Sequence, residues 1–171
     1  APALLHCDAV QGFGKINIKV NELGVDLLTF SGHKIHAPKG IGVLFKKKGV
    51  NIAPVIFGGG QQDSVRPGTE SVPLIYALEG AIRALPNVEE ANKKMQALCD
   101  YAKEKLIATE TVSLNSPQDA IPYILNVSVL GYRSETLLHF LDAQGVFVSS
   151  GSACAKGNQS YVLKELGLAD K

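Results

Sequence analysis

The stretch "VDLLTFSGHKIHAPKGIGVLFKKK", residues 25–48, holds two short apolar runs separated by a loop that carries a lysine between two histidines. Each run ends in polar residues, and so does an earlier run, "ALLHCD" at 3–8. Such runs are typical of buried strands that lead into a loop. The segment between the runs at 3–8 and 25–31 is long enough for a crossover, with one short helical turn around 20–23. We therefore predict part of an α/β sheet.

A turn-rich segment, "FGGGQQDSVRPGTE" at 57–70, precedes two predicted amphipathic helices. The first helix should begin near Ser71, because Pro73 is tolerated in a first turn, and it should end before Pro86. Apolar residues recur at helical spacing in both helices. The expected stripes are Val72, Ile75, Leu78, Ile82 and Leu85 in the first helix, and Val88, Ala91, Met95, Leu98, Ala102 and Leu106 in the second.

Beyond about residue 109 the pattern changes to shorter elements. We expect strands in "TVSL", "YILNVSVL" and "VFVSS", and helices at 134–144 and in "SYVLKELG". This pattern predicts a smaller α/β unit. We therefore expect residues 1–85 to belong to one domain, residues 86–108 to form a connecting helix, and residues 109–171 to form a small C-terminal domain.

The composition excludes several classes of partner. Net charge is +1 with 19% charged residues, so no charge excess indicates nucleic acid or a membrane surface. The longest apolar runs have the length of strands, far below the ~20 residues of a membrane span. Cys7, Cys99 and Cys154 are an odd number at wide spacing, which argues against a disulfide framework. A reducing compartment fits best, and we expect a cytoplasmic protein.

Asp8 and Gln11 fall where the first apolar run gives way to a loop. In open α/β sheets ligands gather beyond the carboxyl ends of the strands. A carboxylate there can pair with a cationic ring nitrogen, and an amide can donate a hydrogen bond to a phenolate oxygen. Taken alone, a strand-terminal aspartate is more often a turn cap and Gln11 a surface residue, so that alternative stays open.

The tetrapeptide "SGHK" ends in Lys34, which can form a Schiff base with an aldehyde cofactor. Ser31 and His33 can contact a phosphate. For the tetrapeptide by itself, an exposed loop with a surface lysine is the favoured interpretation. A metal site made of His33 and His36 with His6 or Cys7 is disfavoured, because the spacing matches no structural zinc motif.

Cys154 ends the Ser/Gly-rich stretch "SSGSAC", where a thiol is accessible rather than packed. Cys99 lies in the second amphipathic helix and Cys7 in a strand, so we interpret both as packing residues. In "RPGTE", Gly68 permits an unusual backbone angle and Thr69 lies at the approach to a helix, where a phosphate can be received. A plain turn followed by a helix cap is the alternative.

Taken together and in order, these motifs resemble the cysteine desulfurases (NifS/IscS-like, class V aminotransferases), which are pyridoxal phosphate (PLP) enzymes of fold type I. The resemblance covers nearly the whole chain and rests on "HCDAVQGFGK", "DLLTFSGHKIHAPKGIGVLF", "GGGQQ…RPGTE", "ILNVS" and "SSGSAC". It implies part of the mixed sheet of the large PLP-binding domain, followed by a smaller, incomplete α/β domain.

The resemblance also implies roles for single residues. Lys34 would bind PLP covalently and then move the α-proton of the substrate. Asp8 would pair with the pyridine nitrogen, and Gln11 would donate a hydrogen bond to the phenolic oxygen. Ser31 and His33 would bind the phosphate.

The resemblance implies roles for two further residues, one in binding the cofactor of a second subunit and one as the nucleophile. Thr69 would reach the phosphate bound by the other subunit, which implies a homodimer. Cys154 would take the sulfur of L-cysteine as a persulfide, with release of L-alanine. A sulfur-acceptor protein in iron–sulfur cluster or thio-cofactor synthesis would then receive it.

Part of the family's site has no counterpart in this sequence. A histidine that stacks on the PLP ring and a further phosphate-binding loop would precede residue 1, and an arginine for the substrate carboxylate would follow Lys171. Neither Arg66 nor Arg133 matches that arginine. We therefore expect a fragment that lacks both ends and binds PLP poorly alone. Alternatives are a selenocysteine lyase or aminotransferase of the same fold, or an inactive remnant that acts as a partner module.

Overall fold

The computed structural model describes residues 3–151 and 160–168. The chain forms two compact units, Ala1–Lys93 and Lys94–Lys171. The boundary between them falls inside helix α3 (Val88–Ile107).

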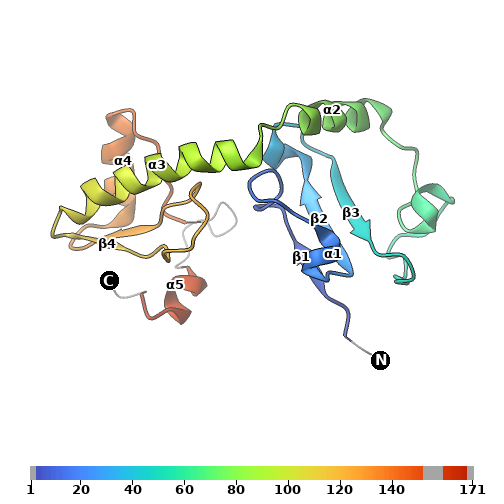
Figure 1. Cartoon of the computed structure of the whole chain (residues 1–171), viewed down its shortest axis with the longest axis horizontal. Coiled ribbons are helices and arrows are strands. Elements are labelled where there is room, and N and C mark those ends of the chain that lie inside the picture. Colours follow the sequence, from blue (N-terminus) through green and yellow to red (C-terminus); the bar gives the residue numbers. More distant parts are fainter. Residues whose placement is uncertain (1–2, 152–159, 169–171) are drawn as a thin grey trace. The chain divides into compact units, whose positions relative to one another are not determined.

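The first unit is built on a three-stranded mixed sheet with the order β1-β2-β3, drawn in blue to cyan in Figure 1. β1 (His6–Asp8) pairs in parallel with β2 (Leu27–Ser31), and β3 (Gly42–Lys46) pairs antiparallel with β2. The crossover from β1 to β2 contains α1 (Val20–Leu23), as the sequence predicts. A mixed α/β sheet at this end of the chain is thereby confirmed.

The core of this unit lies against one face of the sheet. Leu28 and Phe30 are 3% and 8% exposed, because alternate residues of a strand point to the same side. The ring of Phe13, from the crossover, stacks on Phe30 with a centroid distance of 3.7 Å, so it fixes the start of the crossover to the sheet. Residues packed together there are Ala9, Val25, Leu28, Phe30, Ile35, Ala37 and Leu78.

Helix α2 (Val72–Arg83) begins after Ser71 and has Pro73 in its first turn, as predicted. Its Leu78 is buried in the core. The expected apolar stripe is only partly correct, because Val72, Ile75 and Ile82 are exposed although Leu78 is buried. The described residues of the first unit therefore cover only part of the apolar surface of α2.

The break before Pro86 is confirmed, and α3 starts at Val88. The side-chain oxygen of Asn87 accepts the backbone N–H groups of Glu89 and Glu90 at 3.0 and 3.1 Å, so Asn87 caps the helix. Cys99 is 7% exposed within α3, which confirms its interpretation as a packing residue.

The second unit contains an antiparallel pair, β4 (Val112–Leu114) and β5 (Val127–Val129), with α4 (Ser134–Ala143) and α5 (Tyr161–Glu165). The expected strand "VFVSS" is wrong: residues 146–150 form no strand. Apolar alternation makes a strand only where a neighbouring strand can accept its backbone hydrogen bonds, and this segment has no such partner in the described part of the chain. Among the described helices, none is long and apolar enough to cross a membrane.

Candidate active site

The two faces of the first sheet differ in character. The register pairs Asp8 with Thr29 and Cys7 with Leu28, and residues that are paired across neighbouring strands point to the same side. Cys7 therefore shares the core face with Leu28, against which it is partly buried, and its interpretation as a packing residue is confirmed. The opposite face carries His6, Asp8, Thr29 and Ser31, all exposed or partly buried.

Asp8 ends β1 at the edge where parallel β2 also ends. Its Oδ1 atom accepts the N–H of Val10 at 2.9 Å, so the carboxylate does cap the following turn. A carboxylate can accept several hydrogen bonds, and capping therefore does not prevent it from meeting a ligand. Gln11 follows in the same turn, is exposed, and accepts a hydrogen bond from Lys15 at 3.4 Å.

Lys34 lies in a short 3₁₀ helix, η1 (Gly32–Ile35), that continues directly from β2. Gly32 and Ile35 are buried, whereas His33 and Lys34 are exposed. The apolar residues of the turn therefore pack against the core, and its polar side chains are accessible to a ligand. A hydrogen bond of 2.7 Å joins Ser31 Oγ to His33 Nδ1. The two residues expected to bind a phosphate are thereby brought together beside the lysine.

The turn is closed by His36, which has φ of 70° in the left-handed region and donates its backbone N–H to Gly32 O. A histidine tolerates this conformation better than most residues do. Helix α2 contacts η1 and lies across the end of β2 in Figure 1. The lysine turn is therefore supported by the sheet on one side and by a helix on the other.

At Gly32 the packing around the lysine turn leaves no room for a side chain. A Cβ atom there would lie 3.0 Å from Ile41 Cγ2, 3.1 Å from Ala37 Cβ and 3.2 Å from Ile41 O. We expect Gly32→Ala to lower the free energy of unfolding by about 1–3 kcal/mol, because well-packed sites resist added methyl groups. Urea denaturation followed by circular dichroism would measure it.

Gly80→Ala is the matched control for that substitution. Gly80 lies inside α2, and a Cβ atom added there would meet nothing within 4 Å, so alanine should stabilise the helix by about 0.5–1 kcal/mol. Equal effects of the two substitutions would contradict the packing described around Gly32.

Thr69 lies on the loop between η2 (Gln61–Ser64) and α2, and it is exposed. Its neighbour Pro67 is buried, and Gly68 has φ of 110°, a conformation that favours glycine. Within the described residues, no hydrogen bond joins Thr69 to the turn that carries Lys34. The other predicted residue, Cys154, lies outside the described residues.

His6 and Thr29 belong to the polar face but were not among the predicted site residues. His6 Nε2 and Thr29 Oγ1 form a hydrogen bond of 3.2 Å. Strand alternation predicts that His6 and Asp8 point to the same face of the sheet. The pairing of β1 with β2, which brings His6 near Thr29, cannot be predicted from the sequence of either strand alone. Among the described residues, no three His, Cys, Asp or Glu side chains are arranged to hold a metal ion.

The residues present fit PLP by their chemistry. The cofactor offers an aldehyde, a basic ring nitrogen, a phenolate oxygen and a phosphate, which are matched by an amine, a carboxylate, an amide and a hydroxyl–imidazole pair. The amine, the carboxylate and the hydroxyl–imidazole pair lie at the same edge of one sheet, on or just after β1 and β2. The matching residues are Lys34, Asp8, Gln11, Ser31 and His33.

Comparison with known proteins gives a consistent result. The aminotransferase class-V family profile matches residues 1–168. The cysteine desulfurase IscS of Clostridium botulinum is 41% identical over 170 residues, which are 95% of this chain and 43% of that protein. This chain thus spans less than half the length of the curated relatives it matches.

Two solved structures are similar in fold. The NifS-like protein of Rickettsia africae has a TM-score of 0.84 and 34% identity, over 96% of this chain and 44% of that one. SspA, solved in complex with cysteine, has a TM-score of 0.75 and 32% identity, over 96% of this chain and 46% of that one.

Proposed function

Since the chain belongs to the class-V aminotransferase family, we propose that it forms part of a PLP-dependent cysteine desulfurase, which converts L-cysteine to L-alanine and passes the sulfur to Cys154. The observation that carries the proposal is the polar edge of the sheet. There an exposed lysine, a bonded Ser31–His33 pair and a strand-terminal carboxylate occur together. The curated relative at 41% identity is a cysteine desulfurase.

Each residue at this edge has a separate task in the proposed reaction. PLP, when bound, would act as an electron sink for the α-carbon of a substrate linked to it through the substrate amine nitrogen. Lys34 would hold the cofactor covalently through its amine and would move the α-proton of the substrate. Asp8 would pair with the ring nitrogen and keep it protonated, and Gln11 would donate a hydrogen bond to the phenolate oxygen. Ser31 and His33 hold the phosphate.

Cys154 supplies the nucleophile. Its thiolate attacks the sulfur of the substrate, the substrate Cβ–S bond breaks, and an S–S bond forms on the protein. Cβ takes up a proton, so that L-cysteine and a thiol become L-alanine and a persulfide with atoms and electrons balanced. A Gly/Ser-rich loop suits this task, because the thiol must visit both the cofactor and a docked acceptor.

The domain assignment is part of the same proposal. Residues 1–85 would be the C-terminal part of the PLP-binding large domain of fold type I, residues 86–108 the connecting helix, and residues 109–171 the incomplete small domain. Thr69 would contact the cofactor phosphate of a second subunit in a homodimer. The sulfur acceptor would be a protein of iron–sulfur cluster or thio-cofactor synthesis in the cytoplasm.

Visible absorbance of the protein at its full native length, with and without added PLP, tests the proposal. We expect a band that appears with PLP and is lost on borohydride reduction, with the label found on Lys34 by peptide mass spectrometry. L-Cysteine should then yield L-alanine. No band and no label would instead favour an inactive remnant that acts as a partner module.

Residues 1–171 alone should bind PLP weakly and turn over little. A tight complex with full turnover in this shorter polypeptide would contradict the view that further sequence completes the site.

A further inference from the structure

The glycine run 58–60 and the loop 66–68 pack directly on each other. A Cβ atom on Gly58 would lie 2.8 Å from Pro67 Cβ, and Pro67 is buried although its neighbours are exposed. A Cβ atom on Gly59 would lie 2.6 Å from Gln61 Oε1. The Pro67 ring therefore leaves no room for a side chain at Gly58, whereas at Gly59 a Cβ atom would require the Gln61 side chain to move.

The Gln61 side chain that lies over Gly59 also crosses to the second loop. Its Oε1 atom accepts the backbone N–H of Gly68 at 3.2 Å. Gln61 is partly buried and Gly68 is exposed, so the bond joins a half-buried side chain to a loop at the surface.

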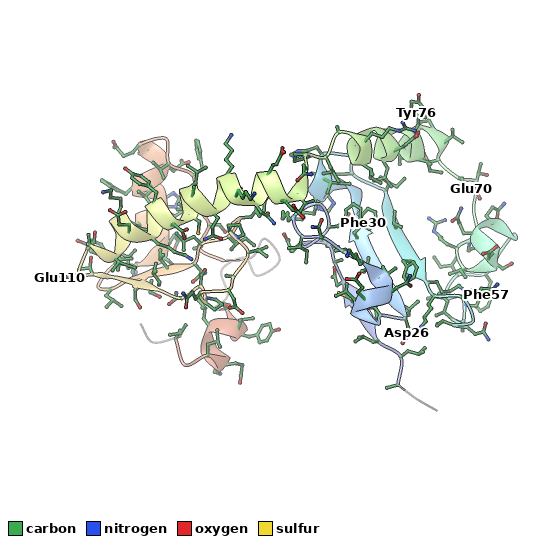
Figure 2. The ribbon with its side chains drawn as sticks, in the orientation of Figure 1. Asp26, Phe30, Phe57, Glu70, Tyr76 and Glu110 are labelled. Carbon is green, nitrogen blue, oxygen red and sulfur yellow. The ribbon has the colours of Figure 1, made fainter. Side chains whose placement is uncertain are left out.

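A second hydrogen bond reaches the same loop at Glu70, the residue after Thr69. Gln62 Nε2 donates to Glu70 Oε1 at 3.4 Å, a longer and exposed contact. Phe57 and Glu70, labelled in Figure 2, lie on either side of the η2 turn from which both glutamines extend. Thr69 therefore lies between Gly68 and Glu70, each of which is hydrogen-bonded to a glutamine of the η2 turn.

The η2 turn has an unusual backbone. Gln62, Asp63 and Ser64 have φ of 49°, 54° and 61°, so three successive residues other than glycine are left-handed. This conformation is unfavourable for such residues and persists only where surrounding contacts hold it. The packing of Gly58 on Pro67 and the bond from Gly68 to Gln61 are contacts of that kind.

We propose that Gln61 is a positioning residue for cofactor binding, which acts by holding the Gly68 N–H so that Thr69 is presented to the PLP phosphate. The inference rests on the proposed function, because it takes Thr69 as the phosphate ligand. Gly68 follows buried Pro67 and precedes exposed Thr69, so the direction of the Thr69 backbone depends on the Gly68 peptide. Gln61 fixes that peptide from outside the loop.

Gln61→Leu in the full-length protein removes the acceptor and keeps the size of the side chain. We expect the Kd for PLP to rise about 5- to 10-fold, the size expected for one lost hydrogen bond. At saturating PLP, kcat and the KM for L-cysteine should stay near wild type. Gln61→Glu retains an acceptor oxygen and should restore PLP affinity.

Hydrogen exchange of the Gly68 amide in the apoprotein gives a readout that needs no cofactor. It should be about 10-fold faster in Gln61→Leu than in wild type or Gln61→Glu. Gln62→Leu is the matched control, and its effect on PLP affinity should stay below about 2-fold, because its longer bond reaches the Glu70 side chain and not the loop backbone.

The outcomes separate the two proposals. A wild-type protein that binds no PLP would overturn the proposed function. A wild-type protein that binds PLP, with a Gln61→Leu variant of unchanged affinity and unchanged Gly68 exchange, would overturn only the role of Gln61. Loss of kcat at saturating PLP together with a lowered melting temperature would assign Gln61 a purely structural role and would also overturn the inference.

Discussion

Lys34→Ala is expected to abolish desulfuration of L-cysteine, with a loss of about 10³-fold or more in kcat. The lysine has two tasks in the proposed reaction, covalent attachment of the cofactor and transfer of the α-proton, and a positioned acid–base group alone contributes about 10²–10⁴-fold. Its side chain is exposed at the end of η1, so its removal leaves no cavity and should not unfold the protein. Alanine formation and borohydride-trapped PLP would be measured together.

Lys39→Ala is the matched control for Lys34→Ala. Lys39 is exposed in the loop between η1 and β3, has the same charge, and is five positions from Lys34. We expect it to keep activity within about 2-fold, as for a surface substitution away from the site. Trapped PLP on a residue other than Lys34, or equal losses in both variants, would contradict the assignment.

Cys154→Ala is expected to reduce sulfur release from L-cysteine by about 10³-fold or more while PLP binding is retained. No other group in the proposal accepts the sulfur atom, and the thiolate is the nucleophilic form of cysteine. The substitution leaves Asp8 and Lys34, the proposed cofactor-binding residues, unchanged, so the absorbance band should remain. Persulfide formation can be followed by mass spectrometry of the intact protein after cysteine addition.

Cys7→Ala and Cys99→Ala serve as controls for Cys154→Ala. Cys7 packs on the core face of the sheet and Cys99 is buried in α3, so each substitution should cost some stability but no more than about 2-fold in activity at moderate temperature. Retained activity of Cys154→Ala towards selenocysteine would favour a selenocysteine lyase. Full activity towards cysteine would overturn the role of Cys154.

Much of the fold could be predicted because its signals are local. Ser71, Pro73 and Pro86 mark the limits of α2, and the apolar runs mark β1, β2 and β3 within a few residues. The turn that carries Lys34 follows from its place after an apolar strand. These features depend on residues that are close in sequence, so the pattern alone indicates them.

The remainder depends on contacts between distant residues. The segment "VFVSS" has the alternation of a strand but no partner in the described structure, and the sequence does not reveal the lack of a partner. Val72, Ile75 and Ile82 of α2 were assigned to the core because they repeat at the same helical spacing as buried Leu78. The Gln61–Gly68 hydrogen bond joins a side chain to a backbone group seven residues away. The spacing of apolar residues in the sequence does not indicate such a bond.

The position of the unit boundary inside α3 has a practical consequence for dissection of this polypeptide. Proteases cleave extended, accessible segments far more readily than the middle of a twenty-residue helix, so limited digestion is a poor way to release either unit. A gene division at Lys93 would split a hydrogen-bonded helix and expose its inner side on both products. Either unit should be expressed with all of Val88–Ile107 attached.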